Sequence, residues 1–101
     1  MKTIPMKRLT IIGENSLEYL VVQDAHELGA TGFTYTVVHG HGEKGTRPNR
    51  WQGPNAKIEI IATPEVAQRI FEHVAKKYFD DYAMIAFLDD VEVLRGEKFG
   101  A

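Results

Sequence analysis

The chain has 101 residues, of which 44% are hydrophobic and 26% charged, and its formal net charge at pH 7 is -2. This length suits one compact domain, predicted to span residues 1–101, and the interspersed charges give no basic field that would attract a nucleic acid. Cysteine is absent, which excludes disulfides and thiolate sites and fits a reducing cytoplasm. No apolar run has the length of a membrane span or a secretory signal, so we expect a cytoplasmic protein that is not itself a membrane protein.

The first half of the chain predicts a strand, a helix and a second strand. Residues 6–12 alternate as a partly buried strand does, with Leu9 and Ile11 on one face. Asn15 and Glu18 have the spacing of a capping box, and apolar residues follow at helical intervals up to Gly29, so a helix is expected there. Residues 33–38 are β-branched and aromatic and predict the second strand.

A segment of different composition follows this second strand. Residues 40–54 contain four glycines, two prolines and two arginines with almost no aliphatic residue. Such a segment cannot bury itself in a core, so it is predicted to form one long mobile loop. Loops of this length commonly serve binding or switching.

The second half predicts strands at 56–61, 84–88 and 91–94 around one helix. Thr63 is a good N-cap ahead of Pro64, and an apolar stripe continues to Tyr78. The order is βαββαβ with a short extra C-terminal strand, which predicts an α+β, ferredoxin-like sandwich with both helices on one side of an antiparallel sheet. The strands carry apolar residues on both faces, so another subunit is expected to cover the second face.

Three clusters of polar residues could carry chemistry. Residues 44–50 bring glycine amides, a hydroxyl and two guanidinium groups together, which are anion-binding parts, although a solvated loop has the same composition. His39, His41 and Glu43 could hold a metal, yet two histidines at a strand end are more often surface residues. The adjacent aspartates at 80–81 and 89–90 suggest general acid–base catalysis. Aspartate is also common in turns, however, and both pairs are predicted to lie in turns.

The residues around the loop resemble those of a known family. Residues 29–42, GATGFTYTVVHGHG, are similar to the part of PII signalling proteins that runs from their first helix through their second strand into the T-loop, and residues 57–60 resemble the strand that leaves that loop. Residues 77–83, 92–94 and 44–50 look more like the PII-like proteins associated with bicarbonate transporters and carboxysomes. Residues 40–54 would then be the T-loop.

The resemblance implies a homotrimer that binds an adenine nucleotide in each cleft between subunits. The adenosine side would be lined by Gly32, Thr34, Tyr35 and Thr36. The phosphates would be bound by Gly45, Thr46, Arg47 and Arg50, of which Gly45, Arg47 and Arg50 would also bind bicarbonate. From the adjacent subunit, the base and ribose would be covered by Asp81, Tyr82, Ala83, Met84 and Ile85.

The sequence differs from nitrogen-sensing PII proteins at positions that bear on which ligand is expected. The glycine-rich phosphate turn is replaced by residues 79–83, and Glu92 and Leu94 stand where those proteins have two arginines. Bound AMP or ADP, or cyclic AMP, is therefore favoured over ATP. The loop is shorter and lacks the uridylylated tyrosine, so control through 2-oxoglutarate is not favoured.

The resemblance favours a non-enzymatic sensor that regulates inorganic-carbon uptake or carboxysome function, with a bicarbonate transporter or carboxysome component as partner through the T-loop. Two alternatives stay open. One is a slow adenine-nucleotide hydrolase that uses the same cleft. The other is a trimeric metal-binding protein of the same fold class that relies on His39 and His41.

Overall fold

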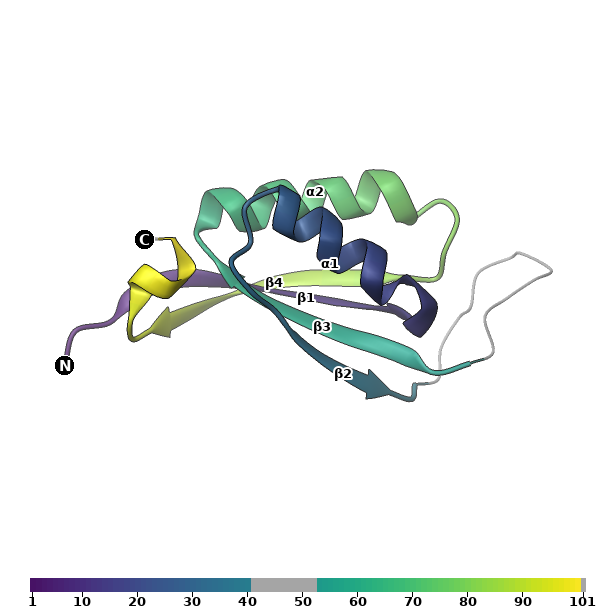
Figure 1. Cartoon of the computed structure of the whole chain (residues 1–101), viewed down its shortest axis with the longest axis horizontal. Coiled ribbons are helices and arrows are strands. Elements are labelled where there is room, and N and C mark those ends of the chain that lie inside the picture. The colour runs from purple at the N-terminus through teal and green to yellow at the C-terminus, as the bar shows by residue number, and fades with distance from the viewer. Residues whose placement is uncertain (41–52, 101) are drawn as a thin grey trace.

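The computed structural model describes residues 1–40 and 53–100. Its described residues form β1 (Ile4–Glu14), a short 3-10 helix (Asn15–Leu17), α1 (Glu18–Glu27), β2 (Thr34–Val38), β3 (Asn55–Ala62), α2 (Pro64–Tyr78), β4 (Ile85–Val93) and a second 3-10 helix (Gly96–Phe99). The strands lie in the order β2-β3-β1-β4, and each neighbouring pair is antiparallel. Both long helices lie on one side of the sheet (Figure 1). The predicted α+β, ferredoxin-like arrangement is confirmed.

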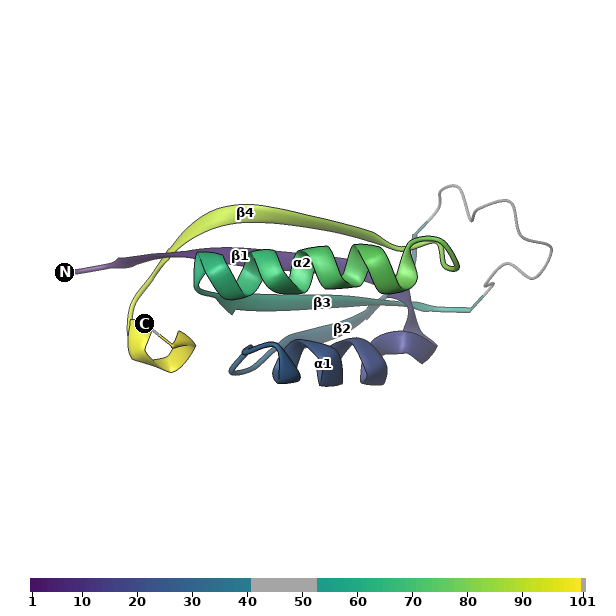
Figure 2. The same cartoon turned by 90° about the horizontal axis from the view of Figure 1, so that it is seen from above.

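The core fills the layer between the helices and the sheet. Alternate residues of the two central strands face the helices, and among them Leu9 and Ile60 have no exposed surface. Figure 2 shows α2 over the centre of the sheet and α1 on its β2 side. Ile70 and Val74 of α2 are likewise fully buried, as its apolar stripe predicts. The backbone N–H of Val66 donates to the Thr63 hydroxyl over 3.4 Å, so the predicted N-cap of α2 is also confirmed.

The start of the first helix differs from the prediction. Asn15 does not cap α1: it begins the 3-10 helix, and α1 starts at Glu18 without a side-chain cap. The Asn15 side chain instead accepts a hydrogen bond from the Tyr35 hydroxyl of β2. Its backbone N–H donates to the Pro54 carbonyl over 3.0 Å. Asn15 therefore ties the end of β1 to β2 and to the residue that precedes β3, which a local capping pattern does not reveal.

The predicted strands at 84–88 and 91–94 are wrong as separate elements, because one strand, β4, runs from Ile85 to Val93. The turn expected at Asp89 and Asp90 is absent from this described part of the chain. Both carboxylates are compensated across the β1–β4 ladder: Asp89 Oδ2 lies 2.7 Å from Arg8 Nη2, and Asp90 Oδ1 lies 2.6 Å from Lys7 Nζ. Cations on the neighbouring strand thus let an acidic pair continue the strand.

The long loop begins and ends at a fixed base. Val38 of β2 pairs with Asn55 of β3, and Pro54 is bound to Asn15 as described above. Most of the predicted T-loop, residues 41–52, lies outside the described residues. Among the helices that are described, none has the length and apolar character needed to cross a membrane.

Candidate functional site

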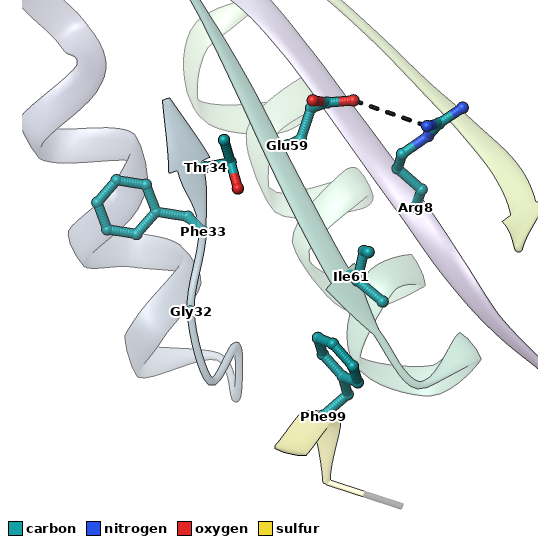
Figure 3. Close-up of a pocket in the computed structure, with 7 residues that line it drawn as sticks. All are labelled: Arg8, Gly32, Phe33, Thr34, Glu59, Ile61 and Phe99. Atoms are coloured by element: carbon teal, nitrogen blue, oxygen red, sulfur yellow. Dashed lines mark ion pairs between the residues drawn. The ribbon is translucent and has the colours of Figure 1, made fainter. Parts of the chain in front are cut away.

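A cleft of about 330 Å³ lies on the side of the sheet away from the helices, at the start of β2. Its strand residues alternate with the core residues of β1 and β3, which explains why they face outward. Figure 3 shows the Phe99 ring directed at Ile61 and the Phe33 ring turned away toward α1. The cleft is lined by Arg8, Gly32, Phe33, Thr34, Glu59, Ile61 and Phe99.

The C-terminal 3-10 helix supplies one wall of the cleft. Arg95 precedes it with φ 58°, a left-handed conformation that turns the chain out of β4. Gly96 then packs so closely on Ile4 that an added Cβ would lie 2.6 Å from its Cδ1, so no larger residue fits without movement. The Thr31 hydroxyl donates to the Lys98 carbonyl over 2.8 Å. These contacts bring Phe99 to the cleft.

Charges in the cleft are arranged around Arg8. Its guanidinium forms a bidentate pair with Asp89, with Nε–Oδ1 and Nη2–Oδ2 distances of 3.1 and 2.7 Å. Glu59 is farther away, with Oε2 at 3.9 Å from Arg8 Nη1 (Figure 3). The hydrogen bonds from Arg8 lower the pKa of Asp89. Because Arg8 is committed mainly to Asp89, the Glu59 carboxylate keeps acceptor capacity for a donor in the cleft.

The chemical character of the cleft follows from this lining. Ile61 and Phe99 give two apolar surfaces, and Thr34 and Glu59 place a hydroxyl and a carboxylate beside them. A flat heterocycle with exocyclic N–H groups suits such a space, because its ring can pack on the apolar walls while its edge donates to the carboxylate.

The structure brings two of the residues predicted for the adenosine side into the cleft, Gly32 and Thr34. Thr36 follows on the same face of β2, where it pairs with Lys57. Tyr35 lies on the opposite face, where its partner Ile58 belongs to the core, and its hydroxyl binds Asn15 as described above.

The turn that connects α2 to β4 lies at the other end of the sheet from the C-terminal 3-10 helix (Figure 1). It carries the residues predicted to cover the base and ribose, so within one chain they do not meet Gly32 and Thr34. Tyr82 and Ile85 expose 37% and 57% of their surface, whereas Met84 is buried. The residues predicted to cover the ligand from this turn are Asp81, Tyr82, Ala83, Met84 and Ile85.

The predicted phosphate and bicarbonate residues lie outside the described part of the chain: Gly45, Thr46, Arg47 and Arg50. Of the predicted metal ligands, His39 is exposed, while His41 and Glu43 fall in the same undescribed segment. Among residues 1–40 and 53–100, no three histidine, aspartate or glutamate side chains gather as a metal site would require.

Five residues of the cleft were not predicted as site residues: Arg8, Phe33, Glu59, Ile61 and Phe99. Arg8 lies on β1, and Glu59 and Ile61 lie on β3. These residues are neighbours only because the two strands pair in this register, which the sequence alone does not reveal. The signals available in the sequence were the outward parity of Glu59 and Ile61 in a predicted strand, and an isolated Phe99 after Gly96.

Comparison with known proteins gives consistent results. Residues 6–98 match the family described as nitrogen regulatory protein P-II. A PII-like signalling protein of Thermus thermophilus is 41% identical, with 98% of this chain and 99% of that chain covered and a TM-score of 0.85.

More distant solved structures share the fold. CPII from Thiomonas intermedia, bound to ADP and bicarbonate, is 23% identical with a TM-score of 0.82, and 97% of each chain is covered. GlnK of B. subtilis is 19% identical with a TM-score of 0.65, covering 87% of this chain and 86% of that one. The resemblance carried by residues 29–42 and 57–60 is confirmed. This chain belongs to the P-II family of nitrogen regulatory proteins.

Proposed function

We propose that this protein is a trimeric PII-like sensor that binds AMP or ADP in clefts between its subunits, together with bicarbonate, and thereby regulates inorganic-carbon uptake or carboxysome function. The observation that carries the proposal is the cleft at the start of β2, where a hydroxyl and a carboxylate stand beside apolar walls. ATP and cyclic AMP are further candidate ligands. The family's regulatory character favours a sensor over an enzyme.

The cleft favours adenine through the chemistry of one edge of the base. Adenine carries an exocyclic amino group, which donates, and the Glu59 carboxylate accepts. Guanine bound in the same orientation presents its C6 carbonyl at this position, so two acceptors would face each other, and its own donors at N1 and C2 would lie elsewhere on the ring edge. Thr34 and Gly32 lie beside Glu59 for the ribose side, and Ile61 with Phe99 provides the surface on which the ring packs.

Two features of the sheet support a closed trimer. Ile85 and Phe87 expose 57% and 46% of their surface on the side opposite the helices, where no described element covers them. The C-terminal 3-10 helix, which contributes Phe99 to the cleft, and the connection from α2 to β4 lie at opposite ends of the sheet (Figure 1), so a complete site of the proposed kind requires the cleft of one chain and residues 81–85 of the next. A head-to-tail contact of this sort forms a ring when the rotation between subunits closes, and a rotation of one third of a turn gives a trimer.

The phosphates and bicarbonate are assigned to the T-loop. Gly45 and Thr46 offer amides and a hydroxyl, and Arg47 and Arg50 offer guanidinium groups, which form the strongest hydrogen bonds to phosphate and carboxylate oxygens. Gly45, Arg47 and Arg50 would also bind bicarbonate. CPII from Thiomonas intermedia, whose structure holds ADP and bicarbonate, supports this pairing of ligands for a related fold. A bicarbonate transporter or a carboxysome component is the proposed partner of this loop, and the protein itself is proposed to be cytoplasmic.

Calorimetric titration tests the proposal, with Arg47→Ala as the principal variant. We expect AMP and ADP to bind the parent and Arg47→Ala to bind at least about tenfold more weakly, because a charge-assisted hydrogen bond contributes about 1.5–3 kcal/mol. Lys2→Ala, at a position that neither lines the cleft nor lies in the T-loop, is the matched control for loss of one positive charge. Equal affinities for parent and Arg47→Ala would contradict the placement of the phosphates.

Calorimetric titration also tests the preference for adenine over guanine and the binding of bicarbonate. Glu59→Gln should narrow the preference for AMP over GMP, since an amide can donate to the guanine carbonyl as well as accept. Bicarbonate should tighten AMP binding by a factor of about 5 to 150 if both ligands order the same loop, with chloride at equal ionic strength as control. An unchanged dissociation constant would remove bicarbonate from the proposal, and release of phosphate during incubation would favour the hydrolase alternative.

A further inference from the structure

A group of polar side chains joins the two helices, on the side of the sheet opposite the cleft. Asp24 of α1 is largely buried, with 15% of its side chain exposed. Its Oδ2 accepts hydrogen bonds from Lys77 Nζ and the Tyr78 hydroxyl, each over 2.8 Å, and lies 3.1 Å from His73 Nε2. A single carboxylate oxygen therefore holds three side chains of the last two turns of α2. We refer to these four residues as the Asp24 cluster.

The cluster is electrostatically suited to an ionised aspartate. Burial raises the pKa of Asp24, but the hydrogen bonds from Lys77, Tyr78 and His73 outweigh burial and leave that pKa below its ordinary value. Lys77 also lies over the Tyr78 ring, 5.3 Å from its centroid. The carboxylate is therefore charged at neutral pH and holds its donors by charge-assisted bonds.

Tyr78 connects this cluster to the turn that follows α2. Its side chain is fixed by Asp24, and the residue is only 3% exposed. Its carbonyl accepts the backbone N–H of Asp81 over 3.1 Å and that of Tyr82 over 3.0 Å. Its ring also packs on the Tyr82 ring, with centroids 6.2 Å apart. The residue held by Asp24 is thus the residue that shapes the turn at 79–84.

We propose that Asp24 is a positioning residue for nucleotide binding: through Tyr78 it fixes the 79–84 turn of its own subunit in the conformation that covers the nucleotide in the cleft of the neighbouring subunit. This inference rests on the proposed function, which assigns Tyr82 and its neighbours to the base and ribose. Asp24 itself touches no part of the proposed cleft. Its effect on affinity is indirect and passes from α1 to the end of α2 and then to the turn.

A purely structural role for the cluster would also predict some loss of stability on substitution, so the test needs a readout at the turn. The protein is produced with 3-fluorotyrosine, and the fluorine resonance of Tyr82 is assigned by its disappearance in Tyr82→Phe. The variants Asp24→Asn and Tyr78→Phe remove the charge and the hydroxyl with little change of shape. The Kd for ADP is measured on the same samples by calorimetry.

Glu72→Gln is the matched control. Glu72, on α2, is also a carboxylate that accepts a hydrogen bond, from Gln68 over 2.9 Å, but that exposed pair lies within a single helix and does not join α1 to α2. We expect Asp24→Asn and Tyr78→Phe to shift the Tyr82 resonance and to weaken ADP binding by about five- to tenfold, the usual contribution of one hydrogen bond, whereas Glu72→Gln does neither. The variant that carries both substitutions should bind ADP with about the affinity of whichever single variant binds it less tightly, because the two substitutions disrupt the same contact.

The outcomes separate this inference from the function on which it rests. A Tyr82 resonance that does not move in Tyr78→Phe overturns the inference, as does a moved resonance with an unchanged Kd. If Asp24→Asn fails to fold, Tyr78→Phe, which keeps the ring in the core, decides alone. A parent protein that binds no ADP overturns the proposed function and the ligand part of the inference, while the fluorine spectra still show whether Asp24 sets the turn.

Discussion

The two faces of the sheet are built from the same strands, yet within the described part of the chain only one of them is covered by helices. On the helix side, Leu9 and Ile60 have no exposed surface, because α1 and α2 cover them. On the other side, Ile85 and Phe87 keep about half of their surface exposed, at 57% and 46%. Adjacent residues of one strand therefore have different roles. One set packs in the core between the sheet and the helices, and the other set, which includes strand residues of the cleft, stays partly or largely exposed.

The largest expected effect follows from Ile60→Ala on the helix side. Removing a fully buried isoleucine side chain leaves a cavity, so we expect a loss of about 2–5 kcal/mol in the free energy of unfolding. Chemical denaturation at one fixed protein concentration measures it, since assembly adds to apparent stability. Ile61→Ala, one position along and on the other face, is the control. Equal losses for the two variants would mean that the faces do not differ as described.

The next effect concerns assembly rather than folding. Phe87→Asp places a charge in the exposed apolar part of the open face, where burial against another subunit would require desolvating it. Light scattering should change from three chains per particle for the parent to one for the variant, while circular dichroism keeps the folded spectrum. Glu18→Gln, on α1, is a control that should leave the particle mass unchanged. A Phe87→Asp protein that stays trimeric would place the subunit contact elsewhere.

The smallest effect is an alkaline titration on the helix side. Burial, and then the hydrogen bond to the Asp24 carboxylate, raise the pKa of Tyr78 from 10.0 to about 12. The folded state favours the neutral phenol, so this contribution to stability is complete below pH 10 and is lost as the pH rises toward 12. Tyrosinate absorbance should show one phenol ionising near pH 12 that disappears in Tyr78→Phe. If Tyr78→Phe leaves that last phase unchanged, the phenol is not held as the structure indicates.

The features that the sequence predicted correctly are those that depend on residues close together in the chain. The Thr63 cap, the buried stripe of α2 and the alternating strands are confirmed because each depends on neighbours within a few positions. The turn predicted at Asp89 failed because its compensating cation, Arg8, is 81 positions away. Asn15 failed as a cap for the same kind of reason, since Tyr35 and Pro54 bind it instead.

The candidate site was predicted in part. Family resemblance supplied Gly32 and Thr34, and the structure places both in the cleft. Arg8, Glu59 and Phe99 were missed because strand register and the C-terminal 3-10 helix bring them together, and neither leaves a contiguous motif. The assignments of Arg47 and Arg50 to phosphate stay predictions, since those residues lie outside the described part of the chain.

The fixed base between β2 and β3 has a consequence for how such a protein can diverge. The Val38–Asn55 pairing and the hydrogen bond from Asn15 to Pro54 hold both ends of the intervening segment in place. Closing a flexible segment between fixed ends costs only about 0.6 kcal/mol more for each doubling of its length. By this relation, a change in the number of residues between the two points adds little to the free energy of closing the segment. The sequence and length of the segment can therefore change while the strands on either side keep their pairing.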